Sequence, residues 1–115
     1  MFEVTEAPFV VRKNDAKNFM EGEERCKQYY KTGQLLFGTS TLAPGTRGAV
    51  DPGHRNGHEI FYVARGQVVC RFPRINRSDK LSEGDIVVIP PGEPHELANE
   101  SSDEALVCWS LAPPD

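Results

Sequence analysis

The sequence predicts a single all-β domain, either a barrel or a sandwich, and three features support this. Short apolar runs typical of strands recur along the chain, at 9–11, 33–42, 58–64, 67–72, 85–90, 95–99 and 104–112. Clusters of Gly, Pro, Asn and Asp separate these runs, and the chain has no sustained 3.6-residue apolar period typical of a helix. The length, 115 residues, is close to the commonest size of one domain.

Turn signals justify each predicted strand in order. The run at 33–42 ends at APGTRG, and DPGHRNG precedes the run at 58–64. Gly66 then turns a hairpin into the run at 67–72. The segments NRSD and SEGD lead to the run at 85–90, PPGEP leads to 95–99, and NESSDE leads to 104–112. Gly and Pro interrupt regular pairing at these points, so we expect short strands with tight connections.

The first part of the chain follows a different pattern, and we predict an irregular N-terminal extension over 1–32 ahead of a barrel over 33–112. Charged residues dominate 13–30. A short helix is expected there around Asp15 to Met20, and Gly22 limits its length. We expect this extension to cover either the barrel or a dimer interface.

The run at 58–64 has apolar residues on both faces of the predicted strand. Ile60 and Tyr62 share one face, whereas Glu59, Phe61 and Val63 share the other, because successive strand residues point to opposite sides. If one face lines a barrel, the outer face also needs a cover. A homodimer is therefore predicted.

Composition excludes several classes of partner. The net charge is −4 with acids and bases interspersed, which argues against a nucleic-acid binder. No apolar run approaches the roughly 20 residues that span a bilayer, and the first residues do not resemble a signal peptide. The three cysteines form no CxxC pair, so we expect a reducing compartment and a cytoplasmic protein. Cys70 and Cys108 are expected to be core residues.

The candidate chemistry lies in two stretches that contain all three histidines of the chain. His95 follows Pro90, Pro91 and Gly92, a combination that forces a tight turn and directs the imidazole toward the interior. Asn99, two alternations further along the same face, is expected to bond to the backbone at the strand end.

Glu59 is expected to be a carboxylate inside the barrel. Burial of a bare carboxylate is costly, so Glu59 requires a metal, hydrogen bonds or a raised pKa. A salt bridge to Arg47 or Arg71 is the structural alternative. His54 lies in the preceding loop and can fold back to the same opening, whereas His58 is expected to face outward. Two histidines and one carboxylate form the ligand set of non-haem Fe(II) sites.

The segment Gly84–Asn99 resembles the second signature of the cupin superfamily, and Glu59 with Gly66 resembles the end of its first. This resemblance implies a double-stranded β-helix, or jelly-roll barrel, with a divalent metal held by His54, Glu59 and His95. Fe(II), Mn, Zn and Ni are the candidate metals. Pro52 stands where the family has its first histidine, so the resemblance implies that one of four ligands is missing.

Three functions remain open at this point. The first is a metal-dependent enzyme acting on a small polar metabolite such as a sugar, sugar acid, or hydroxy or keto acid; isomerase, lyase, decarboxylase and dioxygenase chemistry are not distinguished. The second uses His95 and Glu59 as catalytic acid and base without metal. The third is a ligand-binding or dimerising cupin, since the barrel region also resembles the cupin domain of centromere protein C. Arg47, Arg55 and Tyr62 are candidate substrate-binding residues.

Overall fold

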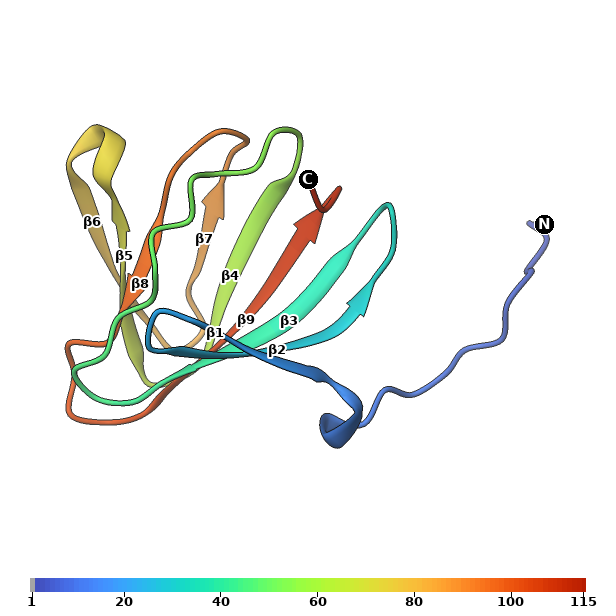
Figure 1. Cartoon of the computed structure of the whole chain (residues 1–115), viewed down its shortest axis with the longest axis horizontal. Coiled ribbons are helices and arrows are strands. Elements are labelled where there is room, and N and C mark those ends of the chain that lie inside the picture. Colours follow the sequence, from blue (N-terminus) through green and yellow to red (C-terminus); the bar gives the residue numbers. More distant parts are fainter. Residues whose placement is uncertain (1) are drawn as a thin grey trace.

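The computed structural model describes residues 2–115, and over this range the predicted all-β fold is confirmed (Figure 1). The chain forms two antiparallel sheets, with strand orders β1-β2-β3-β9-β4-β7 and β6-β5-β8. The strands are β1 (Lys17–Glu21), β2 (Glu24–Lys31), β3 (Leu36–Leu42), β4 (His58–Arg65), β5 (Gln67–Phe72), β6 (Arg77–Ser82), β7 (Ile86–Ile89), β8 (Glu96–Ala98) and β9 (Ala105–Ala112). Two single 3-10 turns, η1 (Lys13–Asp15) and η2 (Pro73–Ile75), are the helical segments of the described chain, and neither is long enough to cross a membrane.

The predicted helix around Asp15 to Met20 is wrong. After the single turn η1 the chain enters β1, which pairs with β2 as a hairpin, and β2 in turn pairs with β3. Gly22 makes the turn in a left-handed conformation (φ +61°), and a Cβ there would lie 2.6 Å from the backbone nitrogen of Ala49. Pairing with β2, which is itself paired with β3, therefore outweighs the charged composition of this segment, which by itself gives a weak strand signal.

The two strands of this hairpin extend the larger sheet, whereas the residues before η1 form an extended segment outside both sheets (Figure 1). The role of the N-terminal extension as a cover stays a prediction.

The core lies between the two sheets and is built by alternation along each strand. In β4, Glu59, Phe61 and Val63 are buried while their neighbours are exposed, as predicted, and His58 faces outward. Burial of each large apolar side chain contributes about 1.5–3 kcal/mol, so this alternation fixes which face of β4 points inward. Glu59 is thereby carried into the interior with its apolar neighbours.

The two cysteines expected in the core differ in position. Cys70 in β5 is fully buried, which confirms its prediction. Cys108 is only half-buried, because it alternates with the inward-facing Val107 and Trp109 in β9 and so lies on the outer face of the sheet. Its predicted place in the core is therefore wrong.

The outer face of β4 and β7 carries exposed apolar side chains. Ile60 is paired with Val88 and Tyr62 with Ile86, and all four are between 40% and 54% exposed. Within residues 2–115, no segment covers these four side chains. The predicted homodimer is consistent with this surface and stays a prediction.

Candidate metal centre

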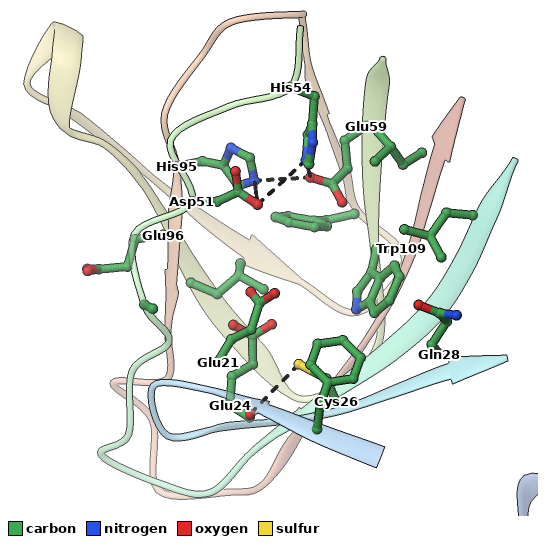
Figure 2. Close-up of a pocket in the computed structure, with 16 residues that line it drawn as sticks. Glu21, Glu24, Cys26, Gln28, Asp51, His54, Glu59, His95, Glu96 and Trp109 are labelled. Carbon is green, nitrogen blue, oxygen red and sulfur yellow. Dashed lines mark hydrogen bonds and ion pairs between the residues drawn. The ribbon is translucent and has the colours of Figure 1, made fainter. Parts of the chain in front are cut away.

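Four polar side chains converge at one end of the space between the sheets: Asp51, His54, Glu59 and His95 (Figure 2). Asp51 and His54 come from the loop between β3 and β4, Glu59 from β4, and His95 from the turn before β8. One ligand atom from each lies within 4.8 Å of the other three. The structure thus brings His54, Glu59 and His95 together, as the sequence predicted, and adds a second carboxylate.

Backbone pairing holds the two loops of the cluster in register. Asp51 and His95 form an isolated antiparallel bridge, in which each amide donates to the other residue's carbonyl, at 2.8 and 3.0 Å. The Gly53 amide donates to Asp51 Oδ1 at 2.8 Å, which leaves Oδ2 free to face the histidines. The Gly92 amide donates to the His54 carbonyl at 2.6 Å. The double-proline turn therefore positions both histidine-bearing loops.

Two acceptor atoms face one another at the centre of this cluster. His95 Nδ1 lies 2.9 Å from the Glu93 carbonyl, so in neutral His95 the proton is on Nδ1 and Nε2 presents a lone pair. That Nε2 lies 3.0 Å from Glu59 Oε1, and His54 Nε2 lies 3.4 Å from the same oxygen. Both His54 Nε2 and Glu59 Oε1 are buried without a hydrogen-bond partner. Facing buried lone pairs are costly unless a proton or a cation lies between them.

The pKa of His95 reflects this competition. Burial disfavours the imidazolium, but the contact with Glu59, the Glu93 carbonyl and the charge of Asp51 together raise the pKa above its ordinary value. A proton on His95 and a cation bound by the cluster would therefore compete for the same Nε2 lone pair. Both would neutralise the same pair of carboxylates.

The sequence pattern missed Asp51, whose carboxylate joins the three predicted residues as a fourth candidate ligand. The family's first histidine position falls on Pro52, and the acid immediately before it supplies the fourth donor. The signal was a carboxylate three residues before His54 in a loop rich in Gly and Pro. Sequence alignment by position overlooks it because a loop can present either of two adjacent residues.

The four residues of the cluster line one end of a cavity of about 100 Å³. Its walls include Phe61 and Trp109, and its opposite side carries the carboxylates of Glu21 and Glu24 (Figure 2). Among the described residues, no lysine or arginine lines this cavity. The two imidazoles are therefore the side chains of this lining that can carry a positive charge.

The three candidate substrate-binding residues lie elsewhere. Arg47 is exposed and pairs with Glu96 at 2.9 Å, Arg55 is exposed in its loop, and Tyr62 lies on the outer face of β4. None of the three lines the cavity in the described chain. Their binding role stays a prediction that this geometry does not support.

The structural alternatives for the other predicted residues also have clear outcomes. Arg47 and Arg71 both approach Glu96 rather than Glu59, at 2.9 and 3.7 Å. Asn99 donates from Nδ2 to the carbonyls of Leu42 and Asp103, so its predicted backbone role is confirmed.

Comparisons with known proteins agree with this architecture. Residues 38–111 match the family model described as Cupin domain. Among curated proteins, none matches this sequence. The fold is similar to that of KdgF from Halomonas sp. (20% identity, TM-score 0.76, covering 95% of this chain and 96% of that one).

Two further solved structures are similar. A predicted oxalate decarboxylase from Thermotoga maritima has 19% identity and a TM-score of 0.76, with 91% of this chain and 99% of that one covered. The Cnp3 cupin domain of Schizosaccharomyces pombe has 11% identity and a TM-score of 0.74, with 87% and 70% covered. At these identities the similarity establishes the fold alone.

Proposed function

We propose a function from one premise: this chain belongs to the cupin family, whose domain model matches residues 38–111. It is a metal-dependent enzyme that acts on a small, polar, oxygenated metabolite bound inside the barrel. The observation that carries this proposal is the pair of buried polar atoms without hydrogen-bond partners, His54 Nε2 and Glu59 Oε1, within a cluster of four candidate ligands. Such a donor set is expensive to bury empty and is relieved by a cation.

Asp51, His54, Glu59 and His95 would hold the ion. Two imidazoles and two carboxylates suit a divalent transition metal, with Fe(II), Mn, Zn and Ni as the candidates. When bound, such an ion polarises a carbonyl or lowers the pKa of a water molecule. The chain itself orients the His95 imidazole, through the Glu93 carbonyl and the Asp51–His95 bridge.

The charge of the cavity narrows the substrate class. With no cationic side chain among its described lining residues, the site disfavours a ligand with several negative charges. A neutral sugar, or an acid whose single carboxylate lies at the metal, fits better than a polyanion or a phosphate ester. Hydroxyl groups of such a ligand can donate to the carboxylates of Glu21 and Glu24 on the other side.

The test is metal stoichiometry and metal-dependent turnover. Purified protein is expected to bind one Zn²⁺ or Mn²⁺ per chain by calorimetry and elemental analysis. His95→Ala should lose this ion, whereas His58→Ala, at the exposed histidine one residue before Glu59, should keep it. Activity found in a screen of sugars and hydroxy or keto acids should disappear with chelator and return with one metal.

A second candidate is metal-free acid–base catalysis by His95 and Glu59. The 3.0 Å contact between His95 Nε2 and Glu59 Oε1 favours it, because a proton can pass directly between these atoms. Turnover that survives complete metal removal but is lost in both His95→Ala and Glu59→Gln would establish this alternative. It would also exclude the metal-dependent proposal.

We also propose a homodimer formed through the apolar outer face of Ile60, Tyr62, Ile86 and Val88. A non-catalytic dimerising role would use the same face. Light scattering after size exclusion is expected to give twice the chain mass, and Tyr62→Asp is expected to give the monomer. Thr39→Asp, on a neighbouring outward position of the sheet, is the matched control.

We further propose a cytoplasmic location, which rests on the cysteine pattern alone.

A further inference from the structure

Glu24, the first residue of β2, is a buried acid outside the cluster of Asp51, His54, Glu59 and His95. Neither that cluster nor the packing of the fold explains why an acid is buried there. It is only 6% exposed, and its carboxylate points into the cavity from the side opposite His95 and Asp51 (Figure 2). Among the described residues, Glu24 forms no ion pair with a lysine or an arginine. Burial of a carboxyl group without a positively charged partner is costly, so its position in a cavity indicates a role beyond packing.

A directed chain of hydrogen bonds orients this carboxyl group. The Trp109 indole N–H donates to Ser40 Oγ at 2.9 Å, and the Ser40 hydroxyl donates to Glu24 Oε1. An indole N–H only donates, so Ser40 accepts from Trp109 and has its own proton left for Glu24. Oε1 of Glu24 is therefore the accepting oxygen. In this arrangement Oε2, which has no hydrogen-bond partner among the described residues, is the oxygen left to carry a proton.

Gly48 provides the space for that second oxygen. A Cβ at position 48 would lie 2.2 Å from Glu24 Oε2 and 3.5 Å from the Glu21 carbonyl. Any side chain at position 48 would therefore displace the carboxyl group. The absence of a side chain at Gly48 and the Ser40 hydrogen bond together fix the position of both Glu24 oxygens.

The electrostatic environment allows Glu24 to exist in both protonation states near neutral pH. Burial raises its pKa from 4.5 to about 7, while the hydrogen bond from Ser40 acts in the opposite direction. Among charged groups facing it from other elements, Glu21 and Glu59 raise the pKa further and His95 lowers it. A carboxyl group that titrates near the working pH suits general acid–base catalysis.

We infer that Glu24 is a catalytic acid–base residue whose Oε2 exchanges a proton with the metabolite held between it and the four-residue cluster. The inference rests on the proposed function, since it requires a ligand in the same cavity. In its carboxylate form Glu24 takes the proton from a carbon next to the ligand's carbonyl. The C–H electron pair becomes the C=C bond of an enolate, and the carbonyl oxygen takes the negative charge. For a ligand with a hydroxyl group on that carbon, return of the proton to the former carbonyl carbon, with transfer of the hydroxyl proton to the first oxygen, completes an isomerisation without an oxidant.

The first test needs neither metal nor substrate. In metal-free protein with ¹³C-labelled glutamate side chains, one carboxyl resonance is expected to titrate near pH 7 and to be missing in Glu24→Gln. Ser40→Ala should move that midpoint upward, because its hydrogen bond stabilises the carboxylate. Addition of dihydroxyacetone, a small neutral hydroxyketone, should shift the same resonance. A resonance that ignores both Ser40→Ala and dihydroxyacetone would contradict the assignment.

The second test follows proton exchange itself. Zinc-loaded wild-type protein in D₂O is expected to replace the carbon-bound hydrogens of dihydroxyacetone with deuterium, observed by ¹H NMR. Glu24→Gln should slow this exchange at least 100-fold, the lower end for loss of an acid–base residue. Zinc stoichiometry should remain unchanged. Glu24→Asp should recover part of the rate, and Glu100→Gln, the same change at an exposed site, should keep all of it.

The outcomes separate this inference from the proposed function. Loss of both zinc and exchange in His95→Ala, with loss of exchange alone in Glu24→Gln, supports both. If the protein binds no metal but its hydrogen exchange still depends on Glu24, the acid–base role of Glu24 is supported and the metal-dependent function is rejected. Unchanged exchange in Glu24→Gln, loss of exchange in Glu21→Gln instead, or no exchange by zinc-loaded wild type overturns the assignment.

Discussion

Replacement of Glu24 by glutamine should change the pH dependence of folding stability in a way that the structure quantifies. Glutamine keeps the acceptor for Ser40 but cannot ionise. In the wild type the pKa rises from 4.5 to about 7 on folding, and each pKa unit corresponds to about 1.4 kcal/mol. Ionisation of Glu24 therefore costs the folded state about 3 kcal/mol once the pH exceeds 7.

Because folding raises the pKa of Glu24, the wild type becomes less stable as the pH rises. Below about pH 4 both states are protonated and the cost is absent. As pH rises through 4.5 the unfolded chain releases its proton while the folded one keeps it, so the wild type loses stability until the pH passes about 7. The stability gained by Glu24→Gln relative to wild type should therefore grow by about 2.5 kcal/mol between pH 5 and pH 8.

Urea denaturation of both metal-free proteins at these two pH values measures the effect, with Glu100→Gln as the control for loss of one exposed acid. A difference between Glu24→Gln and wild type that is the same at both pH values would refute the reasoning. It would mean that Glu24 does not remain protonated in the folded protein at pH 5, and hence that its burial does not disfavour the carboxylate.

Three other predictions follow from the same geometry. Asp51→Ala should weaken Zn²⁺ binding at least 10-fold by calorimetry, because it removes one of four donors; binding equal to that of wild type would show that Asp51 is not a ligand. Zn²⁺ affinity should fall from pH 8 to pH 6, since the pKa of His95 is raised and protons compete for its Nε2; a flat profile would contradict this. Gly48→Ala should lower the free energy of unfolding by about 1–3 kcal/mol, because its Cβ overlaps Glu24 Oε2. Gly33→Ala, where a Cβ meets nothing within 4 Å, is the control, and equal losses in both variants would reject the packing argument.

The strands of the barrel could be predicted because each is short, bounded by Gly or Pro, and alternates in polarity. This held for β4, whose inward face was read directly from Glu59, Phe61 and Val63. It failed for β1 and β2, where charged residues dominate and no local pattern favours a strand. β1 depends on hydrogen bonds to β2, and β2 depends on those to β3, a segment that local sequence patterns do not connect with it.

The residues of the candidate site also fall into two groups, those that the sequence predicts and those that only the structure reveals. His95 and Glu59 were predictable, because a double-proline turn and strand alternation direct their side chains by local geometry. Asp51 was not, since its carboxylate joins the cluster only through a bridge to His95, 44 positions away in the printed sequence. Glu24 lay in a segment expected to be irregular, and its partners Ser40 and Trp109 come from two other strands.

The sequence by itself therefore determined the fold class, the position of the two histidine-bearing turns and the inward face of β4, because these depend on neighbouring residues and on steric limits of Gly and Pro. Only the tertiary structure decided which carboxylates surround the cavity and which arginines stay outside it. The physical reason is that contacts between distant strands and loops depend on how the sheets close around the core, which local sequence patterns do not encode.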